Sequence, residues 1–388
     1  MSETRSIRLM LAFLAVATGF PIIAHAQVVR AHDSDFRVTT VAEGLETPWS
    51  MAWLPNGDML ITERLGRLRV IRDGVLQPTP IQGLPTVHAQ GQGGLLDILP
   101  HPEFEGNQRI YFSYSKPNTD GTESTTAVGR ARFDGAKLTD VEEIFEAKAW
   151  SDRNGHYGSR LAFDAEGYLF VTVGDRQAPS EGDLEAHPAQ DLSNHQGTML
   201  RLNDDGSVPS DNPFVGDAGA LPEIWSFGHR SPQGFAIDAV TGAIWQGEHG
   251  PQGGDELNLI VEGQNYGWPV IGYGVNYGPG IPIHGSQIRE GMESPKHFWA
   301  PSIATSGLMV YRGEAFPEWQ GDIFVGGLAG QQLVRLEMDG QEVVGAETLL
   351  RGFRVRDVRE GPDGYIYVSE EDRDGGPTPI IRLEPTME

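Results

Sequence analysis

A pattern of apolar and polar positions recurs along the chain. In each copy, a stretch of alternating apolar and polar residues leads into a turn rich in Asp, Asn and Gly, and a second apolar and aromatic stretch follows. The clearest copy spans 161–171, and another spans 51–62. Alternation with a period of two is typical of a β-strand with one buried face, and the central turn is typical of a hairpin. The pattern therefore predicts a series of β-hairpins.

Six copies of this pattern determine the fold that we expect. Each copy has a glycine at its turn, where a left-handed backbone conformation is least costly for glycine. In chain order these are Gly57, Gly106, Gly167, Gly242, Gly321 and Gly364. A four-stranded propeller blade takes ~40–50 residues, so the shorter spacings fit bare blades and the longer ones fit blades with insertions. A β-sandwich needs only seven to nine strands in ~100 residues and fits poorly. The sequence predicts an all-β fold, a six-bladed β-propeller.

The two ends of the repeat region are expected to close the ring. The segments 36–41 and 380–383 both have strand-like alternation, and we expect them to pair in the last blade. Insertions fall around 174–225 and 247–305. Because long loops on one face of a repeat fold usually build the binding site, these insertions are expected to surround it.

The first residues have the pattern of a secretory signal. Arg5 and Arg8 precede an apolar run, and the triplet Ala-His-Ala that ends at Ala26 offers small residues around a cleavable bond. The run is short for a bilayer span and contains glycine and proline, which argues against a membrane anchor. We therefore expect cleavage after Ala26, a single propeller domain over 27–388, and a periplasmic or secreted protein.

The charge and the lack of cysteine exclude several partners. The chain has 29 Lys and Arg against 54 Asp and Glu, a formal net charge of −25. Such a surface repels nucleic acids and anionic membranes, so we expect neither as a partner. An anionic ligand would need a local cationic pocket. With no cysteine, the chain has no disulfide and no attachment site for a c-type haem.

His156 is the first candidate for chemistry. It lies between Gly155 and Gly158, directly before the clearest copy of the repeat. A neutral imidazole can take a proton from an alcohol near pH 7. The alternative is a structural histidine that ties loops together, and a lone histidine does not decide between the two.

Three further strings carry amide and cationic groups. Gln92 lies in a glycine-rich turn, and Arg230 precedes Ser231 and a proline. Arg354 and Arg356 are two residues apart on an expected strand, so their side chains share a face. Two guanidiniums repel each other unless an anion lies between them or water screens them. The pair therefore indicates either an anion site or a solvated strand face with Arg–Asp pairs.

The segment 248–258 has the composition of a cation site. A Gly250-Pro251 turn frees carbonyl oxygens, and Asp255 and Glu256 follow closely. Hard oxygen ligands of this kind suit calcium. The segment lacks the ligand spacing of an EF-hand, and its spacing alone leaves metal binding open.

In this order, the strings resemble a known family. The motifs are G-Q-G-G-L, H-x-G-x-R, V-G-D-R at 173–176, G-H-R-x-P-Q-G, E-H-G-P-x-G-x-D-E, N-Y-G-W-P at 265–269 and R-x-R-D-V. They are similar to motifs of soluble aldose sugar dehydrogenases that depend on pyrroloquinoline quinone (PQQ), and of the related glucose/sorbosone dehydrogenases. A single motif of this length is weak evidence, whereas seven in register are specific.

The resemblance implies a PQQ- and calcium-dependent enzyme that oxidises the C1 hydroxyl of an aldose sugar to a lactone. His156 would be the general base, and Arg230 would stabilise charge on the quinone oxygen. The cofactor-binding residues that it implies are Gln92, His156, Arg230, Ser231, Arg354 and Arg356. The carbonyl groups of Gly250 and Pro251 would hold the cofactor's calcium, and Glu256 and Tyr266 resemble ligands of a second, structural calcium. Electrons would pass to a separate soluble or membrane-bound acceptor.

Two positions depart from the family pattern. Ser231 stands where the family commonly has asparagine, and Ala329 stands where many members have a lysine. The lysines of the chain lie elsewhere: Lys116, Lys137, Lys148 and Lys296. Because a charge-assisted hydrogen bond contributes ~1.5–3 kcal/mol, the two changes are expected to weaken PQQ binding unless another group substitutes.

Two other functions remain open from the sequence. Six-bladed propellers also serve as calcium-dependent lactonases, since a fold does not determine a function. A lactonase would hold its metal with side-chain carboxylates in the central channel, and it leaves Arg354 and Arg356 without a role. A propeller that binds but does not catalyse is the third possibility, and the changes at Ser231 and Ala329 favour it.

Overall fold

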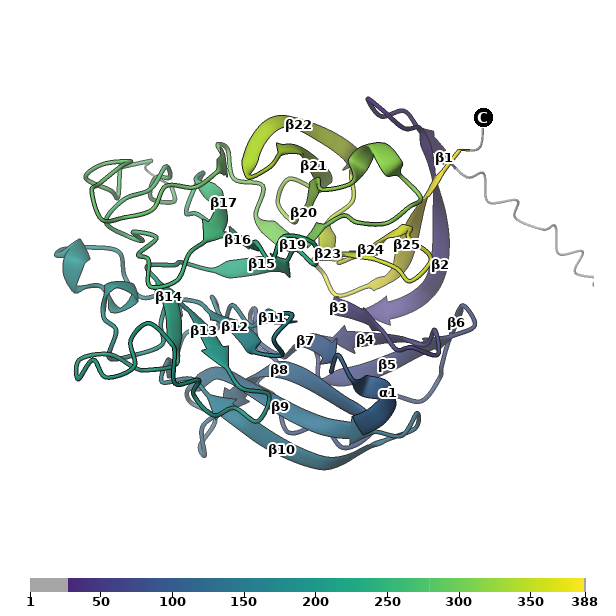
Figure 1. Cartoon of the computed structure of the whole chain (residues 1–388), viewed down its shortest axis with the longest axis horizontal. Helices are drawn as coiled ribbons and strands as arrows, with labels where there is room; N and C mark the ends of the chain where they lie inside the picture. Colours follow the sequence, from purple (N-terminus) through teal and green to yellow (C-terminus); the bar gives the residue numbers. More distant parts are fainter. Residues whose placement is uncertain (1–26, 279, 387–388) are drawn as a thin grey trace, which may run out of the picture.

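The computed structural model describes residues 27–278 and 280–386, which form an all-β fold of six antiparallel sheets (Figure 1). The predicted signal segment, 1–26, lies outside the described residues. Each sheet is a propeller blade that runs from an inner strand at the centre of the molecule to an outer strand. The six-bladed β-propeller predicted from the sequence is confirmed.

The first five blades follow chain order, from inner to outer strand. Blade 1 contains β3 (Pro48–Trp53), β4 (Met59–Glu63), β5 (Arg67–Arg72) and β6 (Val75–Leu76). Blade 2 contains β7 (Leu95–Pro100), β8 (Arg109–Pro117), β9 (Ser124–Phe133) and β10 (Leu138–Glu146). Blade 3 contains β11 (Leu161–Phe163), β12 (Leu169–Val173), β13 (Thr198–Leu202) and β14 (Ile224–Phe227). Blade 4 contains β15 (Pro232–Ile237), β16 (Ile244–Glu248), β17 (Asp255–Ile260) and β18 (His297–Trp299). Blade 5 contains β19 (Thr305–Val310), β20 (Ile323–Gly327), β21 (Gln332–Asp339) and β22 (Glu342–Arg351).

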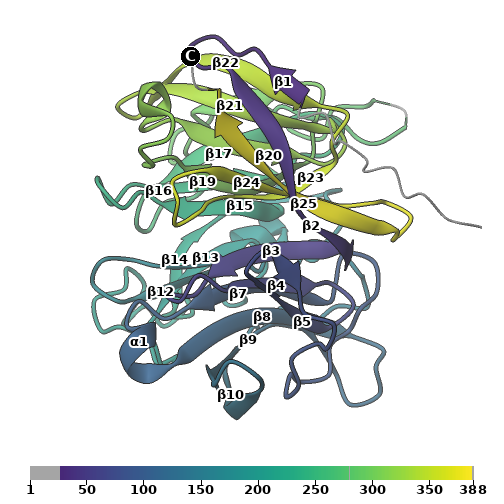
Figure 2. The same cartoon turned by 90° about the vertical axis from the view of Figure 1, so that its right-hand side faces the viewer.

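The sixth blade joins the two ends of the chain. It consists of β23 (Val355–Glu360), β24 (Ile366–Glu370), β25 (Pro377–Pro385), β2 (Phe36–Glu46) and β1 (Gln27–Val29). Strands β2 and β25 lie side by side, with Val38 opposite Leu383 (Figure 2). The expected pairing of 36–41 with 380–383 is therefore confirmed.

Apolar packing closes the ring. Each inner strand contacts the inner strands of both neighbouring blades, from β3 through β7, β11, β15 and β19 to β23 and back to β3. A separate cluster of buried apolar side chains fills each of the six interfaces between blades. Successive side chains of a strand face the two neighbouring blades in turn, so strands such as β4 and β12 are buried on both faces and not on one as the alternation indicated.

The turn glycines behave as predicted in five copies, and the sixth prediction is wrong. Gly167, for example, has φ +86° between β11 and β12, and a side chain there would be strained. Gly106 instead lies inside the one-turn helix α1 (Phe104–Asn107). The left-handed position of that turn is the helix C-cap, Gln108, with φ +55°.

The long insertions reach both ends of the propeller. The connection from β12 to β13 (174–197) lies at the same end as the loops that join one blade to the next. It contains the short 3-10 helices η1 (Leu184–Ala186) and η2 (Pro188–Gln190). Because neighbouring strands are antiparallel, the connection from β13 to β14 (203–223) lies at the opposite end. The prediction that 174–225 surrounds one site thus holds only for its first part.

The remaining helical segment is η3 (Pro317–Trp319), between β19 and β20. Within residues 27–278 and 280–386, none of the helices has the length and apolar character needed to cross a bilayer.

Candidate active site

Two adjoining cavities open at the end of the propeller where the blade-to-blade loops lie. One, of about 790 Å³, is lined by Arg64, Arg354, Arg356 and Arg373, and we call it the arginine chamber. The other, of about 640 Å³, is lined by His156, Asp175, Arg230 and Trp268, and we call it the base chamber. Gln92 and His249 line both chambers, so the two share a wall.

His156 and Asp175 form a hydrogen-bonded pair in the base chamber. The His156 Nδ1 lies 2.6 Å from Asp175 Oδ1, and the two side chains are 9% and 1% exposed. Two further donors hold the carboxylate: the Trp268 indole N–H at 2.8 Å and the Gln177 backbone N–H at 2.8 Å. A carboxylate at Nδ1 fixes the tautomer whose Nε2 has a free lone pair. His156 is thereby prepared to accept a proton at Nε2.

The electrostatics of the pair keep the imidazole neutral. Burial lowers the pKa of His156, and the positive charges of Arg230 and Arg176 lower it further, while Asp175 offsets only part of the effect. Burial alone would raise the pKa of Asp175, but His156 and Arg230 hold it below its ordinary value. A neutral histidine beside an ionised aspartate is the state that a general base requires.

The loop that carries His156 is held in an unusual conformation. His156 has φ +51° and Ser159 has φ +82°, values that residues with a side chain seldom adopt. A Cβ on Gly174 would lie 2.3 Å from the His156 carbonyl oxygen, so only glycine permits this close approach. Such strain persists only where the surroundings impose it, and it clusters at functional sites.

Arg176 supplies much of that constraint. Its guanidinium is 3.6 Å from the centre of the Tyr157 ring and donates to the carbonyl groups of Gly155 and Arg153. The Gln92 side chain adds a further contact, since its Oε1 accepts a hydrogen bond of 2.8 Å from the His156 backbone N–H. The V-G-D-R motif therefore provides both the partner of His156, Asp175, and the clamp on its loop.

Arg230 also lines the base chamber. Its guanidinium lies over the Trp268 ring, 5.1 Å from the ring centre, and donates to the carbonyl oxygens of His249 at 3.0 Å and Gly250 at 2.7 Å. Its backbone N–H donates to the buried Glu248 at 2.6 Å. The structure thus brings His156 and Arg230 to one cavity.

The arginine chamber has only partial charge compensation. Arg356 donates to Glu371 at 2.5 Å and to the Gln233 side chain at 2.8 Å. Arg354 approaches the same carboxylate only to 3.9 Å. Burial would raise the pKa of Glu371, but the two arginines hold it below its ordinary value. One ionised carboxylate thus offsets only part of the charge of two guanidiniums, the arrangement expected of an anion site.

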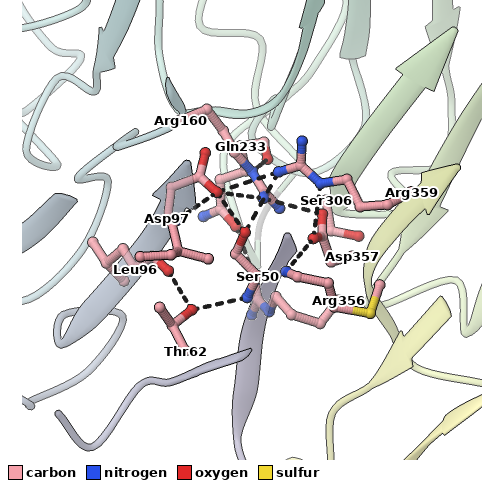
Figure 3. Close-up of polar contacts among 12 residues, drawn as sticks. Ser50, Thr62, Leu96, Asp97, Arg160, Gln233, Ser306, Arg356, Asp357 and Arg359 are labelled. Atoms are coloured by element: carbon pink, nitrogen blue, oxygen red, sulfur yellow. Dashed lines mark hydrogen bonds and ion pairs between the residues drawn. The ribbon is translucent and has the colours of Figure 1, made fainter. Parts of the chain in front are cut away.

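A buried polar cluster on the propeller axis includes residues from inner strands and from the loop leading into blade 3 (Figure 3). Arg160 lies 3.0 Å from Asp357 and 3.5 Å from Asp97, and Arg359 lies 3.2 Å from Asp97. The Arg160 guanidinium also lies 4.1 Å from the centre of the Trp49 ring, which lines the arginine chamber. The axial carboxylates are therefore paired with arginines.

The Gly250-Pro251 turn presents main-chain carbonyl oxygens that can bind a cation. The His249 and Gly250 carbonyl groups converge on the Arg230 guanidinium, which occupies the place of a cation there. No three His, Asp or Glu side chains within the described part of the chain converge in an arrangement that could hold a metal ion. A calcium ion at this turn would therefore depend on main-chain carbonyl oxygens, and carbonyls are ligands that calcium accepts.

Glu256 and Tyr266 line a small adjacent cavity together with Glu248. Burial and the nearby Glu248 raise the pKa of Glu256 well above its ordinary value. The carboxylates of buried Glu248 and half-buried Glu256 fit a bound cation, which would remove their repulsion. The Tyr266 hydroxyl is already occupied, since it donates to the Leu259 carbonyl at 2.7 Å. Tyr266 could thus ligate a cation only through its main-chain oxygen.

A family model described as Glucose / Sorbosone dehydrogenase matches residues 45–382. The chain belongs to the glucose/sorbosone dehydrogenase family. Aldose sugar dehydrogenase YliI of Escherichia coli is 41% identical over 362 residues, which cover 92% of this chain and 95% of that protein. The family resemblance inferred from the seven motifs is confirmed.

Solved structures agree with this membership. The soluble aldose sugar dehydrogenase from Escherichia coli, in its apo-form, is 40% identical with a TM-score of 0.84, covering 90% of this chain and 100% of that one. The PQQ-bound form of an aldose sugar dehydrogenase from Streptomyces coelicolor is 26% identical with a TM-score of 0.73, covering 92% of this chain and 100% of that one.

The two departures from the family pattern have different surroundings. Ser231 is fully buried, its hydroxyl has no hydrogen-bond partner among the described residues, and it is not part of the wall of either chamber. Ala329 lines the arginine chamber, where its methyl group leaves the wall uncharged.

Asp175, Trp268, Glu371 and Arg64 are among the residues of the two chambers that were assigned no role from the sequence. Asp175 and Trp268 lie within the noted V-G-D-R and N-Y-G-W-P motifs, so a signal was present. Glu371 and Arg64 lie on connections between strands without a distinctive local pattern.

Proposed function

We propose that this chain is a PQQ- and calcium-dependent aldose sugar dehydrogenase, which oxidises the C1 hydroxyl of an aldose to give a lactone. The observation that carries the proposal is the buried His156–Asp175 pair, which opens on a chamber that adjoins a cluster of arginines. A neutral base beside an anion site fits an enzyme that deprotonates an alcohol next to a carboxylate-bearing cofactor.

The residues present fit both groups. Gln92, Arg354 and Arg356 would hold PQQ, because the arginine chamber offers guanidinium groups in excess of carboxylate. The carbonyl groups of Gly250 and Pro251 would hold a calcium ion. When bound, PQQ supplies the hydride acceptor, and calcium supplies a fixed positive charge beside it. A second calcium would lie at Glu256 and Tyr266.

The protein's own groups then act on the sugar. His156 accepts the proton of the C1 hydroxyl at Nε2, and Asp175 stabilises the imidazolium that forms. Arg230 places positive charge in the same chamber, where negative charge on oxygen develops. Gln92 holds the His156 backbone, and the low exposure of His156 keeps bulk water from the base.

We extend the proposal to the cellular setting. Cleavage after Ala26 would release 27–388 as a single catalytic propeller domain in the periplasm or outside the cell. Because a chain without cysteine cannot attach a c-type haem, electrons would leave to a separate soluble or membrane-bound acceptor.

The axial cluster supports this proposal over a lactonase function. A lactonase would present side-chain carboxylates to a metal in the central channel, but Asp97 and Asp357 face Arg160 and Arg359 there. The carboxylates of Asp97 and Asp357 are thus already paired with arginines.

Reconstitution tests the proposal. The protein, expressed without PQQ, is supplied with calcium and PQQ, and dye reduction is measured with glucose and other aldoses. We expect activity that needs both additions, and a loss of roughly 10²–10⁴-fold in His156→Ala. His32→Ala, an exposed histidine between β1 and β2, is the matched control and should retain activity. Lactone hydrolysis without PQQ, or PQQ binding without turnover of any aldose, would contradict the proposal.

A further inference from the structure

The arginine chamber has an excess of positive charge that its own residues do not neutralise. Four arginines line it, Arg64, Arg354, Arg356 and Arg373, and its only lining carboxylate belongs to Glu371. The chamber therefore has three positive charges in excess within a chain whose net charge is −25. Its other lining residues include no Asp, Glu or Lys.

Arg64 contributes to this excess without an ion pair. Its Nη1 donates to the carbonyl oxygen of Gly91, and no described carboxylate lies within ion-pair distance of it. Its Nε is buried and has no hydrogen-bond partner among the described residues. The Nε of Arg354 is likewise buried and has no hydrogen-bond partner among the described residues. A buried donor without a partner is costly, so these two Nε groups would gain from an anion bound in the chamber.

The guanidiniums of the chamber repel one another. Burial lowers the pKa of Arg354, and the charges of Arg356, Arg373 and Arg64 lower it further, with Glu371 as the only opposing charge. Burial and the charge of Arg356 likewise lower the pKa of Arg64. An anion with several carboxylates would relieve this repulsion at several guanidiniums at once.

The position of Arg64 is fixed by the loop that carries Gln92. Arg64 lies at the turn between β4 and β5 in blade 1, and its backbone oxygen accepts a hydrogen bond of 3.0 Å from Leu95. The loop passes so close that a Cβ on Gly94 would lie 1.8 Å from that oxygen. Arg64 therefore keeps a constant place relative to Gln92, with which it shares the chamber wall.

The cations lie on one side of the chamber. Arg64 comes from blade 1, and the other three come from blade 6, whereas blade 5 contributes Leu328, Ala329 and Gln331. The blade 5 wall, which includes Ala329, therefore carries no charge.

We propose that Arg64 binds a carboxylate of PQQ and supplies the cation that the blade 5 wall lacks at Ala329. This inference rests on the proposed function, since it takes PQQ, a tricarboxylate, as the ligand. The three excess charges of the chamber match the charge of that ligand. Arg64 is thus a cofactor-binding residue in addition to Arg354 and Arg356.

Direct binding of PQQ, measured by equilibrium dialysis in calcium without any sugar, tests the inference. The variant is Arg64→Gln, whose amide can still donate to Gly91. We expect its Kd for PQQ to rise roughly 10- to 100-fold, because one charge-assisted hydrogen bond is lost. Arg132→Met, an exposed arginine on β9, is the matched control and should leave the Kd unchanged.

A second variant tests the relation to blade 5. Adding Ala329→Lys to Arg64→Gln should recover at least part of the lost affinity, because it places a cation on the blade 5 wall of the same chamber. Arg64→Lys keeps the charge but not the forked geometry, so a rise of a few-fold is expected. Should Arg64→Gln fail to fold, Arg64→Lys decides the matter, and an unchanged Kd in that variant overturns the inference.

The outcomes separate this inference from the proposed function. If Arg64→Gln binds PQQ as tightly as the wild type while Arg356→Met does not, Arg64 is not a cofactor ligand and the proposed function stands. If the wild type itself does not bind PQQ in calcium, both the proposed function and the inference fail.

Discussion

The two chambers share Gln92 and His249, yet they differ in how far the protein satisfies its own polar groups. In the base chamber, each oxygen of Asp175 has a donor within 2.8 Å, and His156 is held at its ring and at its backbone. In the arginine chamber, one carboxylate serves two guanidiniums, and Arg64 has no ion pair with a described residue. The His156–Asp175 pair is thus complete without a ligand, whereas the arginines of the other chamber are only partly compensated.

This difference indicates which property each chamber controls: the state of the base in one, and the affinity for the cofactor in the other. A base must keep one tautomer and one orientation throughout the reaction, so its partners are best built into the protein. A cofactor site gains affinity when the ligand removes an existing repulsion. We therefore expect changes in the base chamber to reduce turnover and changes in the arginine chamber to alter stability and ligand affinity.

The largest effect is expected from Asp175→Asn. The amide of an asparagine can donate a hydrogen bond to His156 Nδ1. This bond favours the tautomer that carries its proton on Nε2, and a protonated Nε2 cannot accept the proton of the sugar hydroxyl. We expect kcat to fall roughly 10²–10⁴-fold, with the Kd for PQQ within about twofold of the wild type. Asp363→Asn, at the turn between β23 and β24, is the control. A fall in kcat of less than tenfold would show that Asp175 does not determine the state of the base.

The sequence predicted the architecture well because the repeat is local. Alternation and a turn glycine such as Gly167 are properties of neighbouring residues, and the two strand-like ends could be recognised in the same way. Gly106 was the exception, since a one-turn helix took the place of a simple hairpin. A glycine alone does not reveal how the turn around it is made.

The site was only partly predictable for the same reason. His156 and the Arg354–Arg356 pair stand in distinctive strings, but the partner of each is set by how the strands of one blade are connected and paired. Asp175 reaches His156 from the next strand connection, and Glu371 reaches Arg356 across blade 6. The partners are 19 and 15 residues away along the chain, and the short motif around each residue does not encode which later connection of the blade will reach it.

Glu371→Gln tests the arginine chamber and should have the next largest effect. The cofactor-free variant loses the only carboxylate among the described residues that pairs with Arg354 and Arg356, so its free energy of unfolding should fall by about 2–3 kcal/mol. Saturating PQQ should stabilise this variant more than it stabilises the wild type, because the ligand supplies the missing negative charge. Urea unfolding with and without PQQ measures both quantities.

The neighbouring Glu370→Gln is the control for that experiment. Glu370 makes no ion pair within the described part of the chain, so its replacement should change the unfolding free energy by less than about 0.5 kcal/mol. Equal losses in the two variants would mean that Glu371 does not compensate the arginines, and the contrast between the chambers would not hold.

The smallest effect concerns pH. Burial and the charges of Arg230 and Arg176 hold the pKa of His156 below its ordinary value of 6.5, despite Asp175. A base works in its neutral form, and a lowered pKa keeps it neutral to lower pH. With saturating PQQ and sugar, kcat should therefore change by less than about twofold between pH 8 and pH 6.5 and decline only below that range. Glu371→Gln, in the other chamber, should show the same profile, and a midpoint at or above 6.5 would mean that burial does not control the base.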